Sequence, residues 1–591
     1  MAIKRYTASA DNTVVNAYEP NLRTRGTGAN MGEADILETF SIYGRVTTSS
    51  QELSRILIKF PVTDISTDRT NGNLPASGNV SFYLRMHNAE HSKTVPRDYT
   101  LSVFTVSQSW QEGVGLDLEG YKDLTVGNEG SNWMSASNST YWTDANDTLL
   151  AGGSYITGAE PNGVGPNADV DTEIYIFKQT LTTGLEDIEL DVTPVIEQWI
   201  AGTYSNYGFG VHLSASYEAY ISGTTTGDIA GRLRTIGQLA LDIDDSTQSV
   251  IYNPSGSTKS YFTKRFFARG TEFFFKRPVI EARWDDATKD DRGNFYYSSS
   301  LATDEWNLNT LYFYNYVRGQ LADIPALGDD KRVYVSIYSG STGGFYGDQG
   351  GGDGDDLAPS NYPASGATAD NTGSIQILSA DGNGTTSANV RSSYLTVVTG
   401  GIVSKGIYSA SFAFTGSEIL KTIFDVWFTG SDTVTNANDA TIQFFTGAVK
   451  PITLQAEGRA TRPTHYLNIT NLRDKYRANE VARLNLYVRD KFWEPTIYTV
   501  ANSTAPATSI ISASYSVYRI IDAYTAIPYG TGSDKHTVLS YDVSGNYFDF
   551  DMNLLEPGYA YAFKFSFYDN GLNSWVQQPD TFKFRVEDHE Y

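Results

Sequence analysis

The sequence predicts an all-β protein made of several domains. Tyr, Phe and Trp make up 13% of its 591 residues, and 53 glycines are available for turns. This composition is typical of antiparallel sheets. Apolar and polar residues also alternate along most candidate strands, which is the pattern of a strand with one buried face. At roughly 150 residues per domain, the chain has room for three or four domains.

The first predicted domain spans residues 1–248. Its clearest alternating runs lie at residues 54–60, 80–86 and 99–106, and clusters of Gly, Asn and Asp separate them. Because this pattern provides a core of its own, we expect residues 1–248 to fold without the rest of the chain.

One short helix is predicted in this domain, over residues 193–200. Thr193 is placed to cap the helix, and Pro194 fits its first turn. Apolar residues recur at helical spacing through the segment, and Gly202 stops it.

Several motifs follow one another along the same domain. They are A-D-N-T at 10–13, the strand at 55–61, S-W-Q-E-G at 109–113, a loop with Trp133 and Trp142 before Gly152 and Gly153, the helix region at 191–202 and N-Y-G-F at 206–209. In this order they resemble the DNRLRE domain family of extracellular bacterial proteins and some phage proteins. The resemblance implies a jelly-roll-like β-sandwich, and some relatives are similar to carbohydrate-binding modules.

Four tryptophans of this domain allow two interpretations. They are Trp110, Trp133, Trp142 and Trp199. Indole side chains in a sandwich domain more often pack in the core than bind a ligand, so we predict core and corner packing. The alternative is a role in ligand binding.

Residues 249–283 differ from the acidic chain around them, because seven basic and only two acidic residues lie between positions 259 and 283. We predict that this strip docks on an acidic surface, either of the first domain or of a neighbouring subunit. The candidate docking residues are Lys259, Lys264, Arg265, Arg269, Lys276 and Arg277. A strand with inward phenylalanines and solvated charges is one alternative. A nucleic-acid platform is another, which the net charge of the chain disfavours.

The second predicted domain spans residues 249–455, so it includes the basic strip, and it forms a second sandwich. Its strand candidates lie at 310–317, 332–338, 406–414 and 423–428. Residues 339–388 form a Gly- and Asp-rich insertion with few hydrophobic residues. Its acidic run, D-G-D-D-L at 353–357, has Leu where the EF-hand template needs a ligand. We therefore predict a solvated surface loop and leave calcium binding open.

The third predicted domain, residues 456–591, is an immunoglobulin-like sandwich. Its strand candidates lie at 481–489, 513–521, 547–552, 559–568 and 581–586, where alternation is nearly perfect. The segment L-E-P-G-Y at 555–559 is similar to the corner before the penultimate strand of immunoglobulin and fibronectin-type sandwiches.

Two further segments carry a second resemblance, F-F-F-K-R-P-V at 273–279 and L-S-Y-D-V-S-G-N-Y at 539–547. With them, the two C-terminal domains resemble the immunoglobulin-like portion of large structural proteins of marine T4-like tailed phages. This resemblance implies a structural role in a virion.

The strongest candidate for catalysis is H-N-A-E-H at 87–91, which matches the H-x-x-E-H string of some zinc hydrolases. That string binds zinc only on a helix that brings both imidazoles to one face. Here it follows an alternating strand, so we predict a surface turn without zinc. The acid pairs at 285–286 and 290–291 are predicted to cap and solvate a turn. We predict no enzyme activity, no cofactor and no metal site.

Charge and missing residue types argue against further functions. The chain has 44 Lys and Arg against 68 Asp and Glu, a net charge of −24, which repels nucleic acid over most of the surface. Without cysteine there are no disulfides, thiolate metal sites or cysteine nucleophiles. The first residues lack the apolar run of a signal peptide, and no segment predicts a membrane span.

These observations favour a virion structural protein, synthesised in the host cytoplasm. It would be a tail, baseplate, neck or fibre component of a tailed phage, with other virion proteins as partners in a symmetric oligomeric assembly. The alternative is a carbohydrate-binding adhesin whose first domain or whose insertion at 339–388 contacts host-surface glycans. A polysaccharide-degrading enzyme ranks third, because no catalytic module is recognisable.

Overall fold

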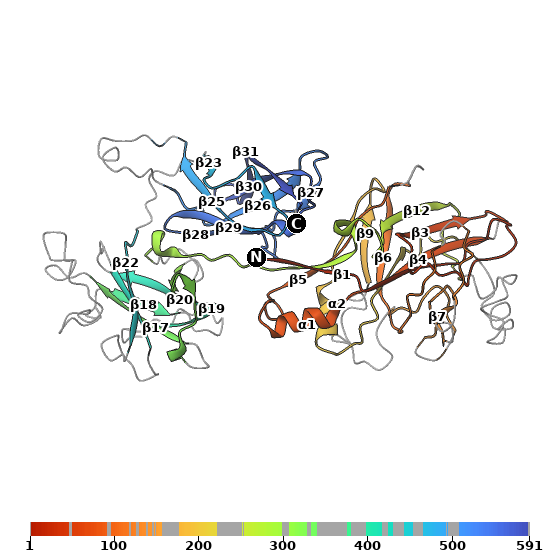
Figure 1. Cartoon of the computed structure of the whole chain (residues 1–591), viewed down its shortest axis with the longest axis horizontal. Helices are drawn as coiled ribbons and strands as arrows, with labels where there is room; N and C mark the ends of the chain where they lie inside the picture. The colour runs from red at the N-terminus through yellow and green to blue at the C-terminus, as the bar shows by residue number, and fades with distance from the viewer. Residues whose placement is uncertain are drawn as a thin grey trace. The chain divides into compact units, whose positions relative to one another are not determined.

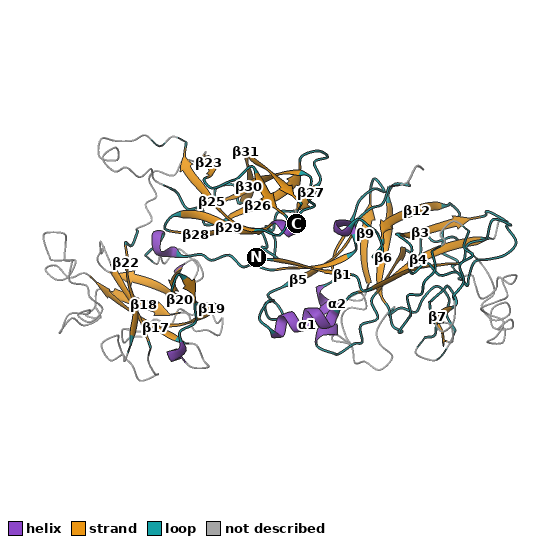
Figure 2. Cartoon of the chain, in the orientation of Figure 1, coloured by secondary structure: helices purple, strands orange, loops and turns teal. Residues whose placement is uncertain are grey.

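The structure is a computed structural model, and it divides into two compact units. The N-terminal unit comprises Ala2–Asp285 with Gly532–His536, and the C-terminal unit comprises Asp286–Thr531 with Thr537–Tyr591. Strands provide most of the regular structure (Figure 2), so the prediction of a multi-domain, all-β sandwich protein is confirmed. The residues that the structure describes are 2–46, 50–90, 96–116, 120–125, 129–137, 140–144, 147, 149–156, 176–221, 251, 253–297, 307–327, 332–339, 375–379, 398–416, 423–429, 442–452, 465–491, 493 and 507–588.

The N-terminal unit consists mainly of two antiparallel sheets (Figure 1). Its strands are β1 (Ile3–Thr7), β2 (Ala10–Val15), β3 (Ile36–Tyr43), β4 (Gln51–Lys59), β5 (Ser81–Met86), β6 (Tyr99–Thr105), β7 (Ser135–Ser137), β8 (Thr140–Tyr141), β9 (Ile176–Leu181), β10 (Ile188–Asp191), β11 (Phe209–Leu213), β12 (Tyr261–Phe267) and β13 (Val279–Arg283). The first sheet has the order β1-β13-β5-β10. The second has the order β12-β3-β4-β11-β6-β9, and β2 also pairs with β4.

Strand β4 is buried on both faces, although its sequence predicts one buried face. Ile56 and Ile58 point into the main core between the two sheets, whereas Leu53 and Leu57 join a second cluster on the other side. That second cluster includes three of the four predicted core tryptophans, and the fourth lies in the main core. All four are buried, so the prediction of core packing is confirmed for Trp110, Trp133, Trp142 and Trp199.

Two helices lie side by side at one end of this unit (Figure 1), α1 (Val62–Thr70) and α2 (Thr193–Ile200). The bounds of α2 confirm the predicted helix. Its predicted cap is wrong, because the Thr193 hydroxyl donates to Asp191 and accepts from the Phe82 amide instead of capping the helix. Arg69 of α1 binds Glu197 of α2 through two hydrogen bonds of 2.7 and 2.6 Å, which joins the helices.

The predicted boundary at residue 248 differs from the structure. The basic strip at 249–283 does not belong to the second sandwich, because both of its strands lie in the sheets of the N-terminal unit. Strand β12 pairs with β3, and β13 lies between β1 and β5. A fragment that ends at residue 248 therefore lacks an interior strand of the first sheet, and we no longer expect it to fold alone. The unit expected to fold alone extends to Asp285.

The first part of the C-terminal unit is an antiparallel sheet of order β14-β20-β19-β17-β21-β22, with β18 paired to β20. These strands and the small β15-β16 hairpin have the bounds β14 (Leu308–Tyr314), β15 (Tyr316–Val317), β16 (Gln320–Leu321), β17 (Val333–Ser339), β18 (Ile375–Ser379), β19 (Val398–Ser404), β20 (Ile407–Gly416), β21 (Ile423–Phe428) and β22 (Gln443–Val449). They surround one aromatic-rich core that includes Phe295, Phe313 and Trp427. The strand β18 lies inside the predicted insertion at 339–388, so this segment is not a loop throughout. Its acidic run at 353–357 lies outside the described residues.

The second part of the C-terminal unit contains two more sheets, β23-β25-β29-β28 and β24-β31-β30-β26-β27. The strands are β23 (His465–Ile469), β24 (Lys475–Arg477), β25 (Val481–Asp490), β26 (Ala513–Arg519), β27 (Thr525–Ile527), β28 (Ser540–Asp542), β29 (Gly545–Asp551), β30 (Ala560–Asp569) and β31 (Ser574–Glu587). The predicted corner precedes β30, the penultimate strand. Its backbone turns at Gly558, where φ is +90°, and the Tyr561 hydroxyl donates to the Glu556 carbonyl at 2.9 Å. This is the bond of a tyrosine corner.

Short 3-10 turns link several of these strands. They are η2 (Phe274–Lys276), η3 (Asp291–Gly293), η5 (Pro325–Leu327) and η8 (Met552–Leu554). In the described part of the chain, no helix has the length and hydropathy needed to cross a membrane.

Candidate functional site

The six predicted docking residues all lie within the N-terminal unit. Two of them lie on β12, Lys264 and Arg265, and three lie on the loop that leads from β12 to β13, Arg269, Lys276 and Arg277, whereas Lys259 precedes β12. Lys264 is the most buried of them, with an exposed fraction of 1%. Its ammonium group donates to Asn88 Oδ1 and to the carbonyls of Gly184 and Glu186, at 2.6, 3.1 and 2.7 Å. Burial lowers the pKa of Lys264 to about 8 against the opposing effect of two nearby carboxylates. Because three acceptors of its own unit surround the ammonium, Lys264 is not available to a partner.

Arg265 and Arg269 bind acidic residues of the same unit. The Arg265 Nε lies 3.4 Å from Glu38 Oε1 on the neighbouring strand. The Arg269 guanidinium makes hydrogen bonds of 2.9 to 3.0 Å to both carboxylate oxygens of Glu112, and its backbone N–H donates to Asp11 at 2.5 Å. Burial raises the pKa of Asp11 to about 7. For these two arginines, the acidic residues that bind the basic strip thus belong to the first predicted domain and not to a neighbouring subunit.

The loop between β12 and β13 presents two exposed phenyl rings next to the remaining cations. We call residues 271–277 the tip. Phe273 and Phe274 are 49% and 57% exposed. The Lys276 ammonium lies 5.2 Å from the Phe267 ring, and the Arg277 guanidinium lies 5.5 Å from the Phe274 ring. Apolar rings of this size are usually buried, so their exposure beside two cations marks a surface that can contact another molecule.

The Arg277 guanidinium at the tip is held by a backbone carbonyl. Arg277 donates from Nε and Nη2 to the Thr271 carbonyl, at 3.0 and 2.9 Å. Neither Lys276 nor Arg277 forms an ion pair with any residue that the structure describes. Lys259 is exposed, whereas Lys276 and Arg277 are half-buried. Three of the predicted docking residues thus have a charge that is available to a partner, namely Lys259, Lys276 and Arg277.

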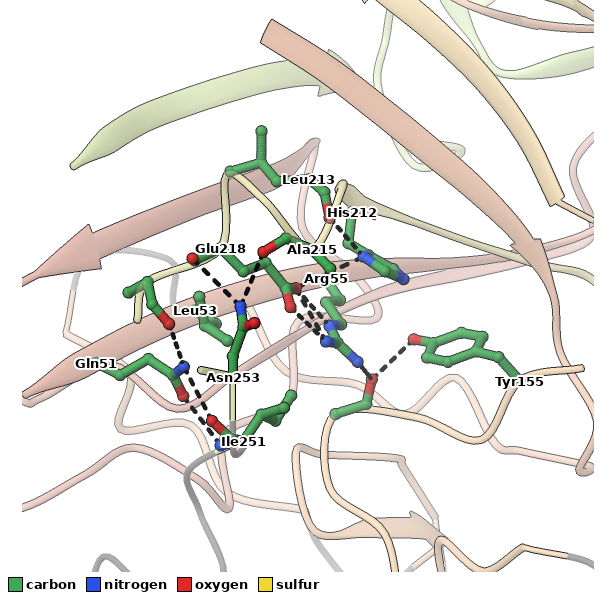
Figure 3. A network of polar contacts seen from close by, with 12 residues as sticks. Gln51, Leu53, Arg55, Tyr155, His212, Leu213, Ala215, Glu218, Ile251 and Asn253 are labelled. Atoms are coloured by element: carbon green, nitrogen blue, oxygen red, sulfur yellow. Dashed lines mark hydrogen bonds and ion pairs between the residues drawn. The ribbon is translucent and has the colours of Figure 1, made fainter. Parts of the chain in front are cut away.

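A buried ion pair in the second sheet was not predicted from the sequence (Figure 3). Arg55, at the centre of β4, points into the tryptophan cluster and binds Glu218 through three hydrogen bonds of 2.9 to 3.0 Å. Its guanidinium lies 5.7 Å from the Trp133 ring and 5.8 Å from the Tyr155 ring. Burial opposes the charge, but Glu218 keeps the pKa of Arg55 above its ordinary value.

Neighbouring polar groups extend this pair into a network (Figure 3). The His212 ring stacks on Phe104 with a centroid distance of 4.4 Å. Its Nδ1 donates to the Leu213 carbonyl at 2.8 Å. Burial and the Arg55 charge hold the pKa of His212 well below its ordinary value, so the ring is neutral at neutral pH. Asn253 donates to the Ala215 carbonyl at 2.8 Å, which fixes the segment that carries Glu218.

A second buried network crosses the first sheet. Glu281 on β13 is fully buried and accepts hydrogen bonds from three arginines of three strands. Arg5 and Arg283 donate at 2.7 Å each, and Arg85 at 3.2 Å. Burial alone would raise the pKa of Glu281, but the three guanidinium groups hold it well below its usual range. In both networks the buried charges pair with one another and so hold distant segments of the unit together.

The structure describes four of the five residues of the H-x-x-E-H string, and they follow a strand as predicted. His87 follows β5 directly, and its Nδ1 lies 3.2 Å from Asp187 Oδ2. Burial lowers the pKa of His87 against the opposing carboxylate. The second histidine, His91, lies outside the described residues. Among the residues that the structure describes, no group of three or more His, Asp and Glu side chains is arranged to hold a metal ion.

The acid pair at 290–291 lies at the turn that follows β13, where Asp290 caps as predicted but is buried rather than solvated. The Asp290 carboxylate accepts from the Arg292 backbone N–H at 3.1 Å and caps η3. Asp291 accepts from the Tyr541 hydroxyl and from the Thr310 amide, both at 2.7 Å. Burial raises the pKa of Asp290 to about 6. These carboxylates join η3 to Thr310 and Tyr541 of the same unit.

The sequence matches no model of a known protein family, and no curated protein is significantly similar to it. The resemblances to the DNRLRE domains and to the structural proteins of T4-like phages thus stay predictions.

Proposed function

We propose that the protein is a structural subunit of a tailed-phage virion, in the tail, baseplate, neck or a fibre, and that it acts through protein–protein interfaces. The observation that carries this proposal is the tip. It combines exposed phenyl rings with cations that have no acidic partner in the described part of the chain. The serial β-sandwiches and the two sequence resemblances support the same function.

The partner that fits the tip is an acidic surface of a neighbouring virion subunit. Two exposed rings provide apolar area at the centre of a contact, and flanking cations add charge complementarity, which speeds docking and fixes its register. The tip lies between β12 and β13, whose pairing to β3, β1 and β5 holds both of its ends. Such a loop can bind a partner with little loss of conformational freedom.

Changing Phe273, Phe274 and Lys276 together to Ser is expected to leave the chain folded but to reduce its incorporation into particles at least tenfold. All three residues lie at the surface, and Arg277, whose guanidinium holds the Thr271 carbonyl, stays in place. Incorporation would be measured by quantitative mass spectrometry of gradient-purified particles, in which the wild-type chain is expected at a fixed copy number.

The matched control changes Val481 and Ile521 to Ser, since these residues are 62% and 77% exposed but lie in the C-terminal unit. The control variant should be incorporated like the wild type. If the tip variant is also incorporated normally, the tip is not a docking surface. If the wild-type chain is missing from particles, the proposed function is wrong.

A further inference from the structure

A row of alternating cations and aromatic rings lies at one end of the sheet β23-β25-β29-β28. Tyr466 on β23 is directly opposite Arg489 on β25. The Arg489 guanidinium lies 5.3 Å from the Tyr466 ring and 5.5 Å from the Trp493 ring, and the Lys491 ammonium lies 5.8 Å from Tyr466. We call these four residues the ladder.

The ladder lies on the solvent side of its sheet. Strand β25 alternates regularly, with Leu484, Leu486 and Val488 buried and the residues between them exposed or half-buried. Arg489 belongs to the second set. Across from it, Tyr466 is 49% exposed. The next pair on the same face is Asn468 and Tyr487, where the Asn468 side chain is exposed. The face therefore offers aromatic rings, a guanidinium group and an amide to the solvent.

Within the described part of the chain, the cations of the ladder bind no carboxylate. Neither Arg489 nor Lys491 forms an ion pair with the residues that the structure describes. The Arg489 Nε is buried and has no hydrogen-bond partner. On the same face of β25, Arg483 is paired, since it binds Asp549 at 2.8 and 3.1 Å.

We infer that the ladder binds an acidic glycan, with the carboxylate of a uronic or sialic acid on Arg489 and a pyranose ring stacked on Tyr466. Arginine is suited to carboxylates because its N–H groups form a planar fork that matches the two oxygens. The exposed aromatic face suits the C–H groups of a sugar ring, which are apolar. A nucleic acid fits less well, because its dense phosphates would be repelled by the acidic chain as a whole. The inference goes beyond virion assembly, and rests on the proposed function only for its assumption that such a glycan lies on the host surface.

The test is binding of the purified full-length chain to an array of oligosaccharides that carry uronate, sialate or sulfate groups, or no charge. Binding is expected only to the carboxylated members and should weaken as salt is raised. Arg489→Gln and Tyr466→Ala should each weaken it at least tenfold. Arg483→Gln is the matched control, because this arginine lies on the same face but is paired with Asp549, and it should bind like the wild type.

Two outcomes would overturn the inference. One is that the folded wild-type chain binds no carboxylated oligosaccharide, and the other is that Arg489→Gln binds as well as the wild type. Binding of sulfated members alone would also contradict the assignment to carboxylates. Because the array needs no particles, its failure would leave the proposed virion role standing, and absence from particles would leave glycan binding standing.

Discussion

Glu281→Gln is expected to destabilise the N-terminal unit by about 3–5 kcal/mol, the usual cost of leaving a buried charge without its partner. Glu281 is fully buried and its carboxylate is shared by Arg5, Arg85 and Arg283. The amide of glutamine has the same size but no charge, and its NH₂ group faces donors. The loss would be measured by urea unfolding, followed through the four buried tryptophans of this unit.

The matched control is Glu587→Gln in the C-terminal unit. Glu587 binds Lys475 at 2.6 Å, but these side chains are 42% and 66% exposed. Exposed pairs contribute about 0–1 kcal/mol, so this variant should lose less than about 1 kcal/mol. Equal losses in the two variants would show that the three arginines do not depend on Glu281.

The effect of Glu281→Gln should also depend on pH. The folded-state pKa of Glu281 is held well below its usual range. Its stabilising contribution is therefore complete above the pKa of the unfolded chain, about 4.3, and is lost as the pH falls toward the folded-state pKa. The difference between wild type and variant should be constant from pH 6 to 8 and should shrink below about pH 4.5. A difference that grows on acidification would contradict the assigned charge state.

Arg55→Met is the second large effect, also expected at about 3–5 kcal/mol. It removes three hydrogen bonds to Glu218 and one to the Gly152 carbonyl, and it leaves the buried Glu218 carboxylate without its cation. Replacing both partners, as in Arg55→Met with Glu218→Leu, removes the charges together and should recover more than half of the loss, since apolar pairs often replace buried ion pairs at little cost.

Arg483→Met is the control for this series, because Arg483 and Asp549 form a similar two-bond pair at the surface, where the side chains are 60% and 40% exposed. It should cost less than about 1 kcal/mol. The account of the buried pair fails if Arg55→Met costs no more than this control. It also fails if the double variant is less stable than Arg55→Met alone.

The sequence predicts the bounds of several strands well from the pattern of apolar and polar residues along each strand. The run at 423–428 coincides with β21, and the run at 481–489 differs from β25 by one residue. In β25 one face meets the core and the other is exposed or half-buried, so alternation carries the information. All six residues of β21 are buried, and its mostly apolar run carries the signal instead. The helix α2 is equally local, since its apolar spacing and Pro194 are both read from a few neighbouring residues.

The remaining features depend on contacts between distant residues. Arg55 is separated from Glu218 by 163 positions, and alternation gave no sign that loops would cover the second face of β4. Lys264 occupies an inward position of β12 because acceptors from other segments surround its ammonium. A local pattern predicts phenylalanines inward and cations outward, which holds for Phe266 but fails for Lys264.

The candidate sites were predicted only in part. The excess of basic residues at 259–283 located the tip, but could not distinguish Arg269, which binds Glu112, from Lys276, which binds no described acid. The ladder was missed, although three of its four residues belong to the predicted strand at 481–489 and the segment just after it. Its only sequence signal was the spacing of Arg489, Lys491 and Trp493, and Tyr466 joins them only through the pairing of β23 with β25.

The most direct test of the central claim is the position of this chain in purified particles. Particles carrying the chain with a C-terminal tag would be labelled with gold and imaged by negative-stain electron microscopy. The proposed virion role predicts label at one fixed level of the neck, tail, baseplate or fibres, in the same place on every particle. Particles without label, from lysates in which the tagged chain is abundant and soluble, would contradict it.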